Sequence, residues 1–212
     1  MSGGRAPGRL ALAVGRARLV TARAADRLVR PVLGARGWDA LRRAVYALEE
    51  ALARRATRGV PAADSAARAV IAPVDAARAA PFAAYLAAHG QDAGWLRRMQ
   101  VERGAVALAA WLDDACLGHV LLVPRAALPD GRPAVQLMNL HVAPAWRGQG
   151  LGRRLLAAFR EHARARGARA VRLSVNRGDG RAVAFYAGAG FRFVEGGPAP
   201  ARPGRAVLEG DA

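Results

Sequence analysis

The hydrophobic positions of residues 68–212 alternate between two spacings, one typical of strands and the other typical of helices. Short apolar runs predict strands at Ala69–Ile71, Ala105–Leu112, Cys116–Val123, Val135–Val142, Val171–Val175, Phe191–Val194 and Ala206–Leu208. Longer amphipathic segments predict helices at Asp75–His89, Ala93–Val101 and Arg153–Arg166. Asp179 can cap a further short helix. This part of the chain therefore predicts one domain of mixed strands and helices.

Residues 1–60 predict a separate helical extension, joined to the domain by a linker at residues 61–67. Two helices are expected, over residues 9–30 and 39–57. Apolar residues at spacings of 3, 4, 3 and 4 form one stripe along the second helix: Trp38, Leu41, Val45, Leu48 and Leu52. The stripe is typical of a helical hairpin docked on the main domain or on a sister subunit, so a homodimer is one expectation.

The charge of the chain offers a different interpretation of this extension. The 33 basic and 16 acidic residues give a formal charge of +17, and every basic residue is arginine. Residues 1–60 hold 13 Arg and 4 acidic residues, a net of +9, against 20 and 12 in the rest, a net of +8. A basic helix can bind nucleic acid or an anionic membrane. Codon bias is the favoured explanation of an Ala- and Arg-rich chain without lysine. Glu49 and Glu50 also interrupt the basic face, so the docked hairpin is favoured.

Several classes of protein are excluded by simple counts. No apolar run reaches the roughly 18 residues that a membrane-spanning helix needs. Cys116 is the single cysteine, so it cannot form an intramolecular disulfide and is expected to be a small core residue. The chain lacks the Cys and His density of a structural zinc site, and no metal is expected. The apolar run Leu10–Val14 is too short for a secretory signal, so we expect a cytoplasmic protein.

A glycine-rich turn follows the predicted strand Val135–Val142 and leads into a helix. The first N–H groups of a helix have no intrahelical partner, and the helix dipole adds partial positive charge there. Gly148, Gly150 and Gly152 lack Cβ atoms, so an anion can approach the backbone closely. Arg147 adds a full positive charge. The pattern predicts a phosphate site, although the spacing differs from that of a dinucleotide fingerprint and of a P-loop.

The residues around this turn resemble two motifs of the GNAT superfamily of N-acetyltransferases. Residues 139–152 resemble motif A, whose Arg/Gln-x-x-Gly-x-Gly/Ala pattern is met by Arg147, Gly150 and Gly152. Residues 175–191 resemble motif B, in the expected order and without gaps. The resemblance covers about residues 68–210 and leaves the helical extension outside.

This resemblance implies an α+β fold with a mixed, mostly antiparallel sheet, flanked by helices and splayed between its fourth and fifth strands. Acetyl-CoA is the implied co-substrate and lies in that cleft. Its pantetheine pairs with the backbone of the fourth strand, and its pyrophosphate binds the amides of the turn. The implied cofactor-binding residues are Leu140, His141, Val142, Arg147, Gly148, Gln149, Gly150, Leu151, Gly152, Asn176, Asp179 and Tyr186.

The implied reaction is direct attack of a neutral amine on the thioester, followed by protonation of the leaving thiolate. Tyr186 occupies the position of the family's general acid, and its alternative role is that of a core aromatic beside Phe185. Many relatives have Asn at the position of Asp179. An ionised aspartate caps a helix but cannot donate a hydrogen bond, and Asn176 is the nearby amide that could replace that donor.

The general base is less evident. The family's two glutamate positions correspond to Gln136 and Ser174, and neither side chain takes a proton at neutral pH. Relatives that acetylate arylalkylamines use histidines where this chain has Gln136 and Met138. His141 lies nearby and has a suitable ordinary pKa, although a half-buried strand histidine is more often structural. The other candidates are a water chain, His119, Asp113 and Asp114.

The sequence therefore predicts an N-acetyltransferase for a primary amine of a small molecule or peptide. Arg97, Arg98 and Arg125 could attract a carboxylate on that acceptor. One alternative is a non-catalytic acyl-CoA-binding sensor, which the missing glutamates favour and Tyr186 opposes. Another is an acetyltransferase acting on an RNA-bound or ribosomal acceptor, which the charge of residues 1–60 suggests.

Overall fold

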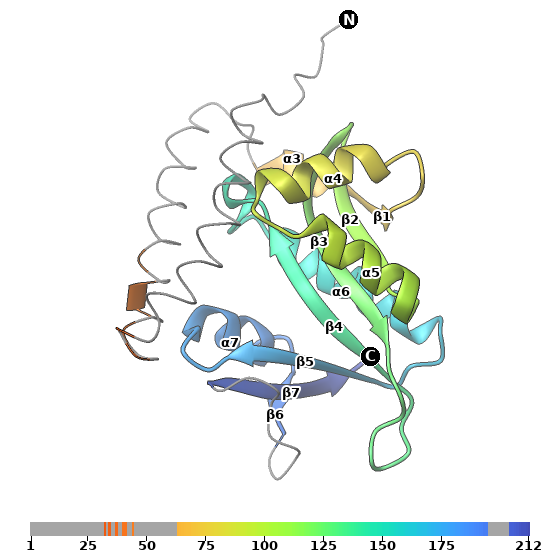
Figure 1. Ribbon diagram of the computed structural model, residues 1–212, viewed down its shortest axis with the longest axis vertical. Coiled ribbons are helices and arrows are strands. Elements are labelled where there is room, and N and C mark those ends of the chain that lie inside the picture. Colours follow the sequence, from red (N-terminus) through yellow and green to blue (C-terminus); the bar gives the residue numbers. More distant parts are fainter. Residues whose placement is uncertain are drawn as a thin grey trace, which may run out of the picture.

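The computed structural model describes residues 63–194 and 204–212, together with isolated helical positions between residues 32 and 44 (Figure 1). Apart from those positions, the expected extension of residues 1–60 lies outside the described residues. Helix α3 (Ala63–Arg68) overlaps the segment 61–67 that was expected to be a linker. In the described part of the chain, no helix is both long and apolar enough to cross a bilayer.

One sheet runs through the described domain. Its strands lie in the order β1-β2-β3-β4-β5-β7-β6. Neighbouring strands are antiparallel except β4 and β5, which are parallel, so the expected mixed, mostly antiparallel sheet is confirmed. The strands span Val70–Pro73 (β1), Val106–Leu112 (β2), Ala115–Pro124 (β3), Ala134–Val142 (β4), Ala170–Asn176 (β5), Arg192–Phe193 (β6) and Arg205–Asp211 (β7).

The sheet divides between β4 and β5. These strands pair only where Ala134–Gln136 face Ala170–Arg172. Beyond that point β4 keeps only β3 as a paired neighbour, while β5 pairs with β7 along its whole length. Residues 137–142 of β4 therefore have no strand partner on their β5 side among the described residues. The expected splay between the fourth and fifth strands is confirmed.

Helices cover both faces of the sheet. On β3, Val120 and Leu122 belong to the core cluster that contains α6 (Leu151–Arg164) and α7 (Gly180–Ala187). The intervening Leu121 and Val123 belong to a second cluster, formed with α4 (Ala79–Ala88) and α5 (Ala93–Arg103). Alternate residues of a strand point to opposite faces, so α6 and α7 lie on one side and α4 and α5 on the other (Figure 1). Phe159 of α6 is fully buried, which contributes about 2–3 kcal/mol.

The start of α4 differs from the prediction. The side chain of Asp75 accepts a hydrogen bond from the amide of Arg78 at 2.9 Å, which closes a turn before the helix. Pro81 then lies in the first helical turn, where its missing N–H group is tolerated. The helix consequently begins at Ala79 and not at Asp75.

Candidate active site

The turn after β4, at Gly148–Gly152, exposes several backbone N–H groups and is called the cradle. A short 3-10 helix, η1 (Pro144–Trp146), leads to Gly148 and Gly150, whose φ values of 80° and 79° suit glycine. A Cβ atom built on either glycine would have nothing within 4 Å. Helix α6 begins at Leu151, and no side chain in the described ranges caps the N–H groups of its first turn. This end of the helix therefore suits an anion such as a pyrophosphate.

Side-chain contacts fix the cradle in place. Arg147 Nε donates to the carbonyl of Val142 at 3.0 Å, and Gln149 Nε2 donates to the carbonyl of Ala145 at 3.1 Å. Gln149 Oε1 is buried and has no partner in the described residues. A Cβ atom on Gly152 would meet the ring of Phe185 at 3.6 Å, so the start of α6 lies against α7. The residues of motif A and motif B are thus in contact.

Strand β4 bulges just before the cradle. Asn139 has a φ of 54°, and the pairing with β3 slips by one residue between Met138 and His141. The side-chain amide nitrogen of Asn139 lies 3.3 Å from His119 Nε2. Leu140 and Val142 pack partly buried against the α6 side of the core. The backbone of residues 140–142 thus forms part of the unpaired edge of β4.

Tyr186 lies on α7 at the boundary between core and surface. Its side chain is 9% exposed, and its ring packs edge-on against Phe185 and Phe191 at 5.1 and 5.6 Å. Burial, with a smaller effect of Asp179, raises the pKa of Tyr186 to about 12. The phenol is therefore protonated at neutral pH, as a general acid must be.

The two polar residues of motif B stabilise local backbone. Asp179 is the N-cap of α7 and accepts a hydrogen bond from the amide of Ala182 at 3.0 Å, so the predicted cap is confirmed. Asn176 ends β5, and its side-chain oxygen accepts from the amide of Gly178 at 3.0 Å. Both side chains lie at the open end of the splay, where β5 leads into α7.

His141 belongs to a cluster that the sequence did not reveal as a unit. Its Nδ1 lies 2.7 Å from the hydroxyl of Tyr85 on α4. The ring centroid of His89 is 5.3 Å from that of His141, and the centroid of His119 is 6.0 Å away. Burial is the main cause that lowers the pKa of His141 well below its usual value. Within the described residues, no group of three His, Cys, Asp or Glu side chains is placed to hold a metal ion.

Comparisons with known proteins identify the family. Residues 74–191, more than half of the chain, match the model of the acetyltransferase (GNAT) family. The chain belongs to this family of acyltransferases. A mycothiol acetyltransferase from Propionibacterium freudenreichii subsp. shermanii is 41% identical over 83 residues, which are 38% of this chain and 27% of that protein. This chain therefore spans about a quarter of the length of that relative.

Solved structures share the fold of this GNAT domain. The GNAT domain of S. lividans PAT is 19% identical with a TM-score of 0.54, over 68% of this chain and 90% of that one. A ribosomal-protein-alanine N-acetyltransferase from Brucella melitensis is 21% identical with a TM-score of 0.52, over 68% and 99%. At these identities the likeness concerns the fold alone.

The two glutamate positions of the family lie in this GNAT domain where β4 and β5 begin to part. Gln136 faces Arg172 across the parallel pair. Ser174 Oγ accepts a hydrogen bond from Arg205 Nε at 2.8 Å, and the carbonyl of Ser174 accepts from the same guanidinium. Neither position holds a base.

The other candidate side chains differ in their exposure to solvent. Cys116 is half-buried, and burial raises the pKa of its thiol to about 12, which suits an inert thiol. His119 is fully buried. The remaining candidates are all exposed, on the β2–β3 turn, on α5 or after β3: Asp113, Asp114, Arg97, Arg98 and Arg125.

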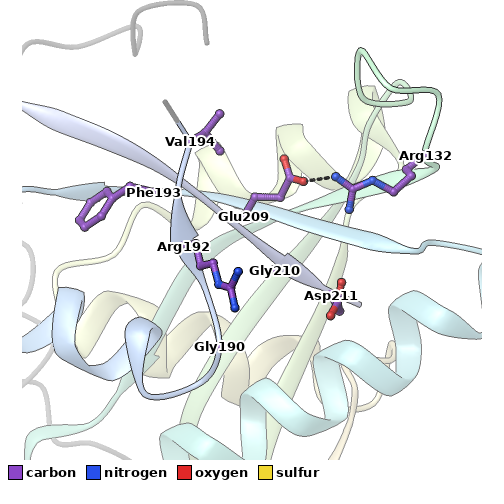
Figure 2. Close-up of a pocket in the computed structure, with 8 residues that line it drawn as sticks. All are labelled: Arg132, Gly190, Arg192, Phe193, Val194, Glu209, Gly210 and Asp211. Atoms are coloured by element: carbon purple, nitrogen blue, oxygen red, sulfur yellow. Dashed lines mark hydrogen bonds and ion pairs between the residues drawn. The ribbon is translucent and has the colours of Figure 1, made fainter. Parts of the chain in front are cut away.

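An open hollow beside β6 and β7 is a separate feature of the surface. Figure 2 shows its lining, in which Glu209 of β7 faces Arg132. Glu209 also accepts a hydrogen bond from Arg172 Nε at 3.0 Å. None of the residues predicted to bind acetyl-CoA lines this hollow.

Proposed function

We propose that this protein is an N-acetyltransferase that moves an acetyl group from acetyl-CoA to a primary amine of a small molecule or peptide. The observation that carries the proposal is that two features lie side by side. Backbone N–H groups are open at Gly148–Gly152, and the preceding strand β4 has an edge without a strand partner in the part of the chain that the structure describes. The cradle supplies donors for a pyrophosphate, and the edge supplies backbone groups for an extended amide chain. Both chemical groups occur in acetyl-CoA, so the residues present fit it.

Acetyl-CoA supplies the activated acetyl group as a thioester. In the proposed arrangement the backbone of residues 140–142 holds the pantetheine, and Arg147 adds positive charge beside the cradle. Tyr186 protonates the departing thiolate, a role supported by its place in motif B on α7 and by a phenol that is protonated at neutral pH. Asn176 and Asp179 order the backbone around the end of β5.

The relatives support acetyl transfer and leave the acceptor open. The mycothiol acetyltransferase matches over 83 residues, which are only 27% of its own length. The acceptor of that relative is therefore one candidate acceptor for this chain, among other primary amines. We also propose a cytoplasmic location, where acetyl-CoA is available.

Acetyl-CoA titration by calorimetry, combined with a thiol-release assay, tests the proposal. The assay uses a panel of 2-phenylethylamine, spermidine, glycinamide and a dipeptide with a free N-terminal alanine. We expect micromolar binding and amine-dependent thiol release. Tyr186→Phe should keep the affinity for acetyl-CoA and lose about 10²-fold or more of the turnover, because one proton transfer is removed.

Other outcomes separate the alternatives. Binding without release from any amine would favour an acyl-CoA sensor or a macromolecular acceptor. An RNA-bound acceptor predicts binding to RNA that falls steeply with salt and is lost on deletion of residues 1–60. A lack of acetyl-CoA binding would refute the assignment of the cradle.

A further inference from the structure

Three histidines and one tyrosine gather between α4 and the sheet. Tyr85 and His89 come from α4 and its C-cap, His119 from β3 and His141 from β4. The ring of Tyr85 lies 4.4 Å from His89, 5.7 Å from His119 and 5.9 Å from His141, measured between centroids. The cluster therefore joins the C-terminal end of α4 to the strand proposed to hold the pantetheine.

The hydrogen bonds of His89 fix which of its ring nitrogens carries the proton. His89 Nδ1 lies 2.8 Å from the carbonyl oxygen of Tyr85. A carbonyl only accepts, so Nδ1 must donate, and the lone pair of the neutral ring is on Nε2. His89 is also the C-cap of α4, and the negative end of the helix dipole stabilises an imidazolium there.

The two other histidines of the cluster are poorly suited to take up a proton. His141 Nδ1 is engaged with Tyr85 Oη, and His119 is fully buried with Nε2 beside the Asn139 amide. Burial lowers the pKa of His119 to about 4 and that of His141 well below its usual value, and the charge of His89 lowers both further.

Several titratable side chains of the cluster face His89. Tyr85 faces it from its own helix, His141 from β4 and His119 from β3. Farther away, Arg147 acts on Tyr85 and His141 from the cradle side. A proton that enters this cluster is therefore best held at its α4 end.

We propose that His89 is the general base of the transfer and takes a proton from the acceptor ammonium at Nε2, while Tyr85 and His141 position it. This inference rests on the proposed function. The C-terminal end of α4 lies near the C-terminal end of β4 (Figure 1), and the His89 ring centroid is 5.3 Å from that of His141. In this proposal the ring faces an amine that approaches the thioester. It supplies the base that Gln136 and Ser174 do not.

The ammonium gives one proton to His89, and the neutral amine forms the C–N bond as the C–S bond breaks. The thiolate takes the proton of Tyr186, and the nitrogen returns its second proton to the resulting phenolate. The imidazolium of His89 then releases its proton to water, the one proton that the overall reaction produces.

His89→Asn tests the inference, because an asparagine amide can still donate to the Tyr85 carbonyl but cannot take a proton. The thiol-release assay is run from pH 5.5 to 9.5 with the panel amine that wild type acetylates fastest. We expect kcat/KM of the variant at pH 7 to fall about 10²–10⁴-fold. Its rate should keep rising with pH as free amine accumulates, whereas the wild-type rate levels off near neutral pH. His162→Asn, on α6, is the matched control and should behave as wild type.

Calorimetry with acetyl-CoA and thermal unfolding check that His89→Asn is folded and binds as wild type does. A wild-type pH profile in an active, folded His89→Asn would overturn the inference and leave the proposed function standing. Loss of the plateau in His141→Asn but not in His89→Asn would overturn it too, since the base would then be on β4. No thiol release by wild type from any panel amine would overturn both the proposed function and this inference.

Discussion

Gly118 on β3 is the residue at which packing and the proposed acetyl-CoA site are most directly coupled. A Cβ atom at this position would lie 2.8 Å from the carbonyl oxygen of His141 and 3.3 Å from the Cα of Val142. It would also lie 3.1 Å from a methyl group of Leu155. Two of these three neighbours are backbone atoms of β4, which cannot rotate away. Gly118→Ala should therefore displace β4 at the residues proposed to bind the pantetheine.

The size of the effect follows from the kind of contact. Adding a methyl group to a packed interior costs about 1–3 kcal/mol. Because backbone has to move, we expect about 2 kcal/mol, which lowers the melting temperature by roughly 4–8 °C for a chain of this size. A comparable loss of acetyl-CoA binding energy corresponds to at least about tenfold weaker affinity. Urea denaturation and calorimetry measure the two effects separately.

Gly180→Ala is the matched control. Nothing lies within 4 Å of a Cβ atom at Gly180, and this residue begins α7. The alanine should leave acetyl-CoA binding unchanged and stabilise the helix by up to about 1 kcal/mol. If Gly118→Ala were as stable as wild type and bound acetyl-CoA equally well, the close packing of β3 against β4 would be refuted.

Two further predictions concern stability. Glu209→Gln should lower the free energy of unfolding by about 1–3 kcal/mol in urea denaturation, because Arg172 is only 9% exposed and loses its charged partner. The control is Asp130→Asn, in an exposed pair with Arg132, which should have no measurable effect on that free energy. Unfolded chains protonate histidine near pH 6.5, whereas folded His119 resists protonation until about pH 4, so its contribution to stability is lost as the pH falls through that window. The loss should reach about 3 kcal/mol, and His119→Gln should show a smaller difference in unfolding free energy between pH 7 and pH 4; an equal difference in both proteins would contradict the assignment.

The elements of the main domain could be predicted because each carries its own local pattern. Short apolar runs marked β2, β3 and β4, and Asp179 marked the start of α7. The first helix was predicted too early, since the turn at Asp75 depends on a side-chain hydrogen bond that apolar spacing does not report. Helix α3 was missed because alanine and serine without large apolar groups give no periodic signal.

The candidate site divides in the same way. The cradle consists of backbone N–H groups, so three closely spaced glycines, Gly148, Gly150 and Gly152, were enough to predict it. The histidine cluster depends on tertiary contacts, in which a helix and two strands bring together residues as far apart as Tyr85 and His141. The one available signal was the four-residue spacing of Tyr85 and His89, which places both on one face of a predicted helix.

The arginines of the described domain give part of its positive charge a structural use. Guanidinium groups of α6 donate to backbone carbonyls of other segments: Arg154 to Ala66 and Ala69, Arg160 to Ala189, and Arg164 to Ala212. Arg147 and Arg205 do the same for Val142 and Ser174. A planar fork with five N–H donors suits this role better than an ammonium group does. Because these bonds use carbonyls and not carboxylates, they leave the net charge positive, and this part of the charge needs no nucleic-acid partner to explain it.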